Sequence, residues 1–195
     1  MRLRPVRMDD AAFIVWLRGL EHAKGKLGDS AVTVADQERW LAAYFDRDGD
    51  YYFIAESIGG TPLGTNSVYD VAGKTAECGR LIVCPGVPAA LPTSLLTYDM
   101  AFDRLGLQEL RATSVASNLT LHSFVKKLGY HQGETDHAAR KIAGESVDIF
   151  NFTLKAATWR RQREKLIPLA EYAGRRMAEW EIRAQHEIRY GSNTM

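Results

Sequence analysis

The sequence predicts a mixed α/β (α+β) domain, a meander of strands followed by alternating helices and strands. Residues 51–56, 63–71 and 76–84 are strand-like and are separated by glycine-containing turns, which favours an antiparallel meander. Residues 89–105 and 118–128 instead repeat apolar side chains every three to four positions, as helices do. A strand-like segment at 107–117 lies between these helices, and a last strand is predicted over 146–154, which completes the α/β pattern.

The first 45 residues predict one short strand and two helices. Residues 3–6 read as the strand, after which Asp9 and Asp10 offer an N-cap to a helix over 11–20. Thr33, with Asp36 three positions later, predicts a capping box at the start of the second helix. The glycines and lysines of residues 19–28 interrupt the apolar periodicity, so we expect a loop there.

Composition narrows the class of protein. The chain has 195 residues, of which 46% are hydrophobic and 25% charged, in the range of one globular domain. Its 25 basic and 24 acidic side chains give a net charge of +1, which predicts no nucleic-acid partner. The sequence has neither an apolar run of about 18 residues nor an apolar segment behind its opening Met-Arg-Leu-Arg-Pro. We therefore predict a cytoplasmic protein with no membrane partner.

The two cysteines predict neither a disulfide nor a metal site. Cys78 and Cys84 fall at equal parity in one strand-like segment, and a disulfide between them would require that strand to fold back. Two thiols are also too few for a zinc site. We expect both to be reduced and no metal to be bound.

The charge balance divides the chain near Leu154. Residues 155–195 hold nine basic and five acidic side chains, so we predict a domain over 1–154 and a basic helical extension over 155–195. Pro168 predicts that a helix restarts there. The extension carries one apolar stripe: Leu166, Leu169, Ala173, Met177, Trp180, Ala184 and Ile188. Such a stripe needs a partner, either the same domain or a second copy of the chain in a homodimer.

Residues 115–130 resemble a segment of the GNAT superfamily of acyl-CoA-dependent N-acyltransferases. The shared pattern is Asn118, a helix, and then Lys127-x-Gly129 followed by an aromatic residue. The stretch from Val83 through Cys84 and Pro85 into the next helix resembles the family's fourth strand and third helix, and the order of elements agrees over residues 3–154. Trp16-Leu-Arg18, Gln37 and Trp40 most resemble the branch of ribosomal-protein and amino-sugar acetyltransferases.

The resemblance implies a sheet that splays between its fourth and fifth strands and holds the pantetheine arm of acetyl-CoA in the cleft. Backbone groups of Leu81 and Val83 would bind that arm, and Gly79 suits the β-bulge that opens the sheet. Asn118 would lie on the cofactor side. The family's spaced glycines are missing from the phosphate loop, where Pro88 and Pro92 remove two amide donors. The cofactor's pyrophosphate would then rest on the next helix N-terminus, on backbone amides and two hydroxyls: Ala89, Ala90, Thr93 and Ser94.

Amide formation from a thioester needs a base for the amine and an acid for the departing thiolate. Glu77 matches the position of the general base in some members of the family. The family's frequent general-acid tyrosine aligns with Val125, so His122, one helical turn earlier, is the candidate substitute. Tyr69 and Asp70, late in the third strand, are candidates to line the acceptor side.

The loop after the first helix is, by the same resemblance, the segment that overhangs the acceptor. His22, Lys24 and Lys26 there suit an anionic group, such as the diphosphate of a nucleotide-linked amino sugar. We therefore predict an enzyme that moves an acetyl or short acyl group from acyl-CoA to a primary amine on a small or nucleotide-linked amino sugar. The alternatives are acetylation of a protein N-terminus or lysine, and a non-catalytic module that binds a ligand or a partner.

Overall fold

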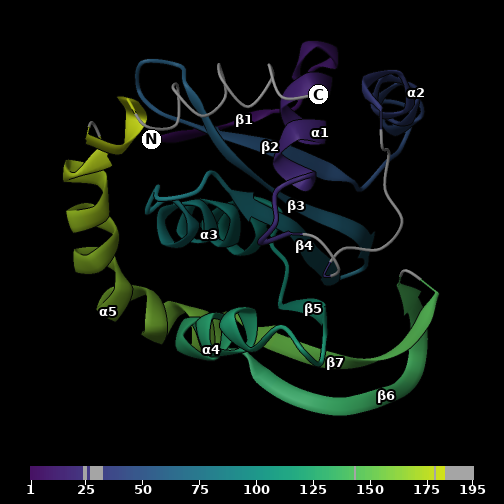
Figure 1. Ribbon diagram of the computed structural model, residues 1–195. Coiled ribbons are helices and arrows are strands. Elements are labelled where there is room, and N and C mark those ends of the chain that lie inside the picture. Colours follow the sequence, from purple (N-terminus) through teal and green to yellow (C-terminus); the bar gives the residue numbers. More distant parts are fainter. Residues whose placement is uncertain (24–25, 27–32, 143, 178, 183–195) are drawn as a thin grey trace.

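A seven-stranded mixed sheet forms the centre of the computed structural model, which describes residues 1–23, 26, 33–142, 144–177 and 179–182. The strand order is β1-β2-β3-β4-β5-β7-β6, and only β4 and β5 are parallel neighbours. Figure 1 shows the sheet in two parts, β1 to β4 and β5 to β6, which diverge from each other. The strands are β1 (Arg2–Pro5), β2 (Tyr51–Glu56), β3 (Pro62–Ala72), β4 (Thr75–Val83), β5 (Glu109–Val115), β6 (His131–Ile142) and β7 (Glu145–Lys155).

The helices cover the sheet in two groups, each with its own core. One cluster of buried side chains joins the first two helices to β2, and the other joins the last three helices to β5 and β7. The helices are α1 (Ala11–Arg18), α2 (Val34–Tyr44), α3 (Ala90–Asp99), α4 (Leu119–Leu128) and α5 (Ala156–Arg175). The third predicted helix is thus shorter as an α-helix and continues as a π-helical turn, Met100–Arg104.

Two predicted helix starts are confirmed in detail. Thr33 caps α2 by accepting a hydrogen bond from the Asp36 amide, and the Asp36 carboxylate completes the capping box. Asn118 caps α4 by accepting from the Leu121 amide at 3.3 Å. α4 ends at Gly129, whose φ of +98° lies in the left-handed region that glycine adopts without strain.

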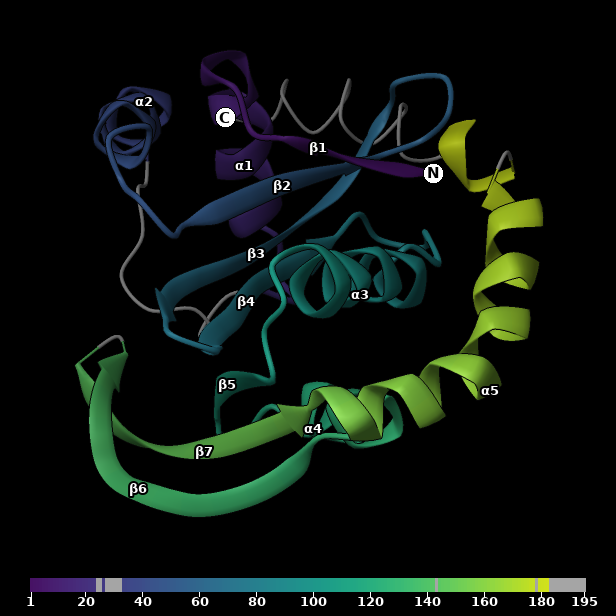
Figure 2. The same ribbon diagram turned by 180° about the vertical axis from the view of Figure 1, so that it is seen from behind.

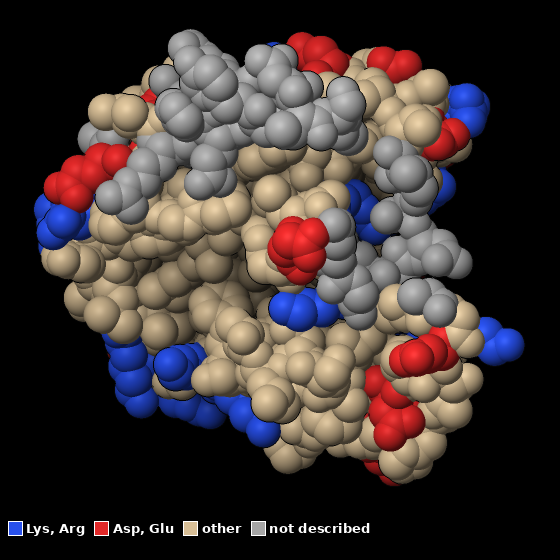
Figure 3. Space-filling model, in the orientation of Figure 1, with Lys and Arg blue, Asp and Glu red and all other residues tan. Residues whose placement is uncertain are grey.

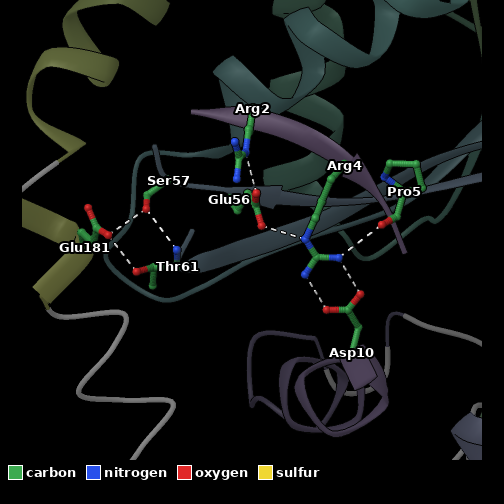
Figure 4. Close-up of polar contacts among 8 residues, drawn as sticks. All are labelled: Arg2, Arg4, Pro5, Asp10, Glu56, Ser57, Thr61 and Glu181. Atoms are coloured by element: carbon green, nitrogen blue, oxygen red, sulfur yellow. Dashed lines mark hydrogen bonds and ion pairs between the residues drawn. The ribbon is translucent and has the colours of Figure 1, made fainter. Parts of the chain in front are cut away.

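Asp10 is the N-cap residue of α1, as predicted, but its side chain forms no capping hydrogen bond with α1, because its carboxylate binds Arg4. A 3-10 turn, Met8–Asp10, precedes α1, and the Asp10 carboxylate accepts two hydrogen bonds from Arg4, at 2.6 and 2.7 Å. Arg4 also donates to Glu56 at 2.7 Å, as Arg2 does at 2.6 Å (Figure 4). These ion pairs fasten the edge strand β1 to β2 and to α1.

The sheet splays between β4 and β5, the position that the resemblance to the GNAT superfamily implies. β4 pairs with β5 only from Thr75 to Glu77, and beyond Glu77 the two strands separate. The bulge follows Gly79 rather than centring on it: Arg80 has a φ of +58°, and the register with β3 shifts opposite Asn66. Gly79 serves a different purpose, because a Cβ there would lie 2.9 Å from the Tyr69 hydroxyl.

β6 was not predicted. Residues 131–142 are mostly exposed and carry no alternation of apolar side chains, so the usual signal of a half-buried strand is missing. The strand forms at the sheet edge through its pairing with β7. Its existence depends on a tertiary partner rather than on its own pattern.

The C-terminal segment packs on its own chain. α5 runs through Pro168 without the predicted restart. The Trp159 indole is buried and donates to Asp99 on α3 at 3.2 Å, and Arg163 binds the same carboxylate at 2.6 and 2.8 Å. Figures 1 and 2 show α5 passing from α4 along one side of the molecule toward the N-terminus.

Further along this segment, Met177 is buried in the core of the first half of the chain. Glu181 accepts hydrogen bonds from Ser57 and Thr61, both at 2.7 Å (Figure 4). Part of the predicted apolar stripe is therefore covered by the same chain, whereas Leu169 is exposed and Ala184 and Ile188 lie outside the described residues. The division at Leu154 and the homodimer stay predictions. No described helix is long and apolar enough to cross a membrane.

Because Trp159 lies in the core, α5 should be needed for stability. We expect Trp159→Ala to lower the free energy of unfolding by about 3–5 kcal/mol, measured by urea denaturation. Leu169→Ala on the exposed face of the same helix should change it by less than about 0.5 kcal/mol. Equal effects of the two substitutions would show that α5 does not pack as described.

Candidate active site

A cavity of about 450 Å³ lies where β4 and β5 separate. Cys78 to Val83 of β4 line one side, and Ala112 to Ser114 of β5 line the other. The remaining lining residues come from loops, from helices and from the middle of β3: His22, Ala23, Lys26, Asn66, Ala90, Tyr98, Asn118, Thr120, Leu121, Phe124, Val125 and Tyr130. The face of the molecule in Figure 3 is hollowed between α3 and α4, and mostly uncharged residues surround the hollow.

The β4 backbone offers hydrogen-bonding groups to this cavity. The Cys84 amide donates to Leu63 of β3 at 2.9 Å, and amides alternate in direction along a strand. The Val83 amide therefore points away from β3, toward the side where β5 no longer pairs. Leu81 and Val83, the residues predicted to bind the pantetheine arm, both line the cavity. A ligand with amide groups can satisfy this open edge as a further strand would.

The predicted phosphate-binding residues are not brought together. Ala90 and Asn118 line the cavity, the latter while capping α4. Ala89, Thr93 and Ser94 are fully buried, and the Thr93 hydroxyl contacts the Met1 sulfur at 3.9 Å. The two hydroxyls therefore face the core, which leaves the backbone amides at the start of α3 as its donors for a phosphate.

Glu77 lies beside the cavity rather than in its lining. It is the last β4 residue that pairs with β5, opposite Arg111, and it also pairs with Tyr69 of β3. Burial raises the pKa of the Glu77 carboxyl, the Arg111 charge opposes this shift, and Asp70 adds to it. Tyr69 and Asp70 do not line the cavity, and the Tyr69 ring instead lies under Arg80.

His122 occupies a packing position. Its ring is buried between Phe150 and Phe152, with centroid distances of 4.9 and 5.3 Å, and its Nε2 lies 3.1 Å from the Val115 carbonyl oxygen. Burial lowers the pKa of the imidazole. Because the ring is not part of the cavity lining, this position does not support a role for His122 as the acid.

Cationic side chains line part of the cavity. His22 and Lys26 line it, whereas Lys24 lies outside the described residues. Arg80 also lines it, with its guanidinium bound to Asp50 at 2.7 and 3.1 Å and lying 4.4 Å from the Tyr69 ring centroid. Arg18 lies near Arg80, and burial and that neighbour lower its pKa. The Arg18 Nε is buried with no hydrogen-bond partner in the part of the chain that the structure describes.

Comparisons with known proteins bear on the fold. No family model and no curated protein sequence matches the chain. Among solved structures, a mutant of the spermidine N-acetyltransferase SpeG from Vibrio cholerae matches with a TM-score of 0.72 and 15% identity, over 81% of this chain and 95% of that one. A GCN5-related N-acetyltransferase from Brucella melitensis matches with a TM-score of 0.73 and 18% identity, over 87% and 81%. The chain has the GNAT fold.

Within this GNAT fold, three buried side chains meet where β4 and β5 begin to separate. Cys78, Tyr98 and Tyr130 all line the cavity, and the two tyrosine rings lie 5.9 Å apart at 67°. Burial raises the pKa of the Cys78 thiol to about 12 and also raises the pKa of both phenols. Neither cysteine forms a disulfide, and a thiol with a pKa as high as that of Cys78 is a poor nucleophile.

Sequence reasoning missed Arg80 and this tyrosine pair as cavity residues. Tyr130 reads as the aromatic residue of the helix-ending motif, and Tyr98 as part of an apolar helix face. No sequence pattern predicts that α3 and the end of α4 pack together next to Cys78. Among the described residues, no group of three or more His, Cys, Asp or Glu side chains could hold a metal ion.

Proposed function

We propose that the chain is an N-acyltransferase that moves an acetyl or short acyl group from acyl-CoA to the primary amine of a small acceptor. The observation that carries the proposal is the open β4 edge along a 450 Å³ cavity, which suits the two amides of a pantetheine arm. The two structural neighbours described above are N-acetyltransferases, which supports the same chemistry. The amine nitrogen attacks the thioester carbonyl and loses a proton, the C–S bond breaks, and the sulfur gains a proton.

The acceptor is proposed to carry an anionic group. His22, Lys26 and Arg80 line the cavity, and none of the described lining residues is acidic. SpeG acts on spermidine, a polycation, which a site of this charge would repel. A phosphate or carboxylate would instead gain charge-assisted hydrogen bonds. An amino sugar linked to a nucleotide diphosphate has both the amine and the anion.

Arg18 supports an anionic acceptor independently of the lining. A buried guanidinium nitrogen without an acceptor is costly, and the Asp50 carboxylate that neutralises Arg80 is already bound to that residue by two hydrogen bonds. An anion entering beside Arg80 would weaken the repulsion between the two guanidinium groups.

A non-catalytic ligand-binding module is the second candidate. Val125 replaces the expected tyrosine, and the Thr93 and Ser94 hydroxyls are buried away from any phosphate. Acetylation of a protein N-terminus or lysine is a further alternative, and the cationic side chains of the cavity lining do not favour it.

Acetyl-CoA binding separates an enzyme from a module that binds something else. We expect calorimetric titration to give micromolar affinity, which Val83→Pro should weaken about tenfold because one amide donor is lost. Val83→Ala keeps that amide and is the matched control. Circular dichroism must show that both variants fold. No binding by the wild-type protein at millimolar acetyl-CoA would reject the proposed function.

Reversing the charge of Lys26 should act on the acceptor. Lys26→Glu should raise the KM for an anionic amine acceptor roughly 10- to 100-fold, the range of a lost charge-assisted hydrogen bond. The dissociation constant of acetyl-CoA should stay within about twofold, and Lys165→Glu on exposed α5 should change neither constant. If acetyl-CoA binding weakened instead, Lys26 would serve the phosphates of the cofactor.

We further propose that Glu77 accepts the proton of the amine through a water molecule. Its raised pKa makes it a stronger base than an ordinary glutamate once it is deprotonated. Glu77→Gln should lower kcat/KM about 100-fold at pH 7 and less at high pH, where the amine is already neutral. The wild-type rate should fall as the pH drops through the raised pKa, and the variant should lose that dependence. An unchanged rate would remove Glu77 from the mechanism.

A further inference from the structure

We propose that the Tyr130 hydroxyl protonates the departing CoA thiolate. This inference rests on the proposed acyl transfer and names the acid that the reaction requires. The starting observation is a buried phenol that faces a ligand cavity with its hydrogen-bonding capacity unused. Tyr130 is 5% exposed, lines the cavity and forms no well-aligned hydrogen bond through its hydroxyl within the described part of the chain.

An unused hydroxyl in this position indicates a ligand. Burying a phenol without a partner is unfavourable, and buried tyrosine hydroxyls usually find one. The groups nearest to it, the Tyr98 hydroxyl and the Cys78 thiol, are weak acids like itself and raise its pKa rather than lower it. Both neighbours stay protonated near neutral pH. The Tyr130 hydroxyl is thus a donor that lacks an anionic acceptor.

The position of Tyr130 along the cavity suits the sulfur of the acyl donor. Tyr130 adjoins Cys78, the first β4 residue beyond the pairing with β5, so it stands where the cleft closes. The amides of an extended pantetheine arm would bind along β4 between Val83 and this point. Its thioester would then reach the closed end, between Val125, Gly79 and Tyr130.

Two side chains could carry a hydroxyl to this place. The Tyr130 amide donates to the Val125 carbonyl at 3.1 Å, so the two residues are joined across the end of α4, and both side chains line the cavity. Val125 has no proton to give. A tyrosine at position 125 would present its hydroxyl from the preceding helical turn to the same end of the cavity.

The proton transfer balances without a further reactant. The amine nitrogen forms a bond to the thioester carbon, the C–S bond breaks, and its electron pair stays on sulfur. The Tyr130 O–H proton moves to that sulfur and gives CoA–SH and a phenolate. The amine releases one proton in the reaction. Solvent in the cavity carries a proton back to the phenolate, which restores the Tyr130 hydroxyl.

The test removes only this hydroxyl. Tyr130→Phe should lower kcat about 100-fold, the scale of general acid catalysis, with the KM for acetyl-CoA within about threefold. The melting temperature should change little, because among the described residues the hydroxyl has no well-aligned hydrogen bond to lose. Tyr130→Phe with Val125→Tyr should recover at least tenfold in kcat. A structural role for Tyr130 would give the opposite result, a lower melting temperature with no rescue.

An acyl donor with selenium in place of sulfur gives a second readout. A selenolate needs no proton to depart, because a selenol is a much stronger acid than a thiol. The loss caused by Tyr130→Phe should therefore shrink below about fivefold with this donor. A loss of the same size with both donors, or a loss in Tyr98→Phe but none in Tyr130→Phe, would overturn the proposal. Activity of the wild-type protein, measured alongside, tests the proposed function separately.

Discussion

The separation of β4 and β5 after Glu77 is the constraint on which the rest of the structure depends. Two strands that part inside a sheet leave rows of amides and carbonyls without partners, and such groups must be solvated or bound. Here they border a cavity that side chains from α3 and α4 complete. The positive φ of Arg80, which an arginine rarely adopts, belongs to the bulge that turns β4 away from β5. The fold thus creates an open sheet edge and encloses it in the same step.

Asp99 connects α3, which contributes residues to the cavity lining, to α5. Its carboxylate accepts from both Trp159 and Arg163, so α3 and α5 form one body. The Tyr98 ring packs against Trp159, with centroids 5.0 Å apart, and against Tyr130 on its other side. A helix that composition marks as a basic extension therefore sets the position of the buried phenols. Its charged face is solvated, whereas its first turns are part of the core.

The parts of the fold that were predictable carry local signals. Patterns of only a few residues predict three of these features: the strands of the meander, the Thr33 capping box and the α4 segment from Asn118 to Gly129. β6 has no such signal, because it is an exposed edge strand defined by β7. For the site, the lining by Leu81, Val83, His22 and Lys26 was predictable from resemblance. The burial of Thr93 and Ser94 and the meeting of Cys78, Tyr98 and Tyr130 depend on how helices pack, which one sequence does not display.

The backbone fold and the side chains contribute different properties to the cavity. The fold provides an open strand edge, whereas the side chains determine the charge of the lining. The GNAT backbone provides the open β4 edge, and structures of the same fold include enzymes named for spermidine, a polycation. In this chain His22, Lys26 and Arg80 line the cavity, and the uncharged weak acids Cys78, Tyr98 and Tyr130 meet where β4 and β5 begin to separate. A polycation and an anion cannot both be favoured by one charge pattern. If the proposed function is correct, the choice of acceptor would reside in the loop after α1 and in the β4 bulge, which can change while the open β4 edge is kept.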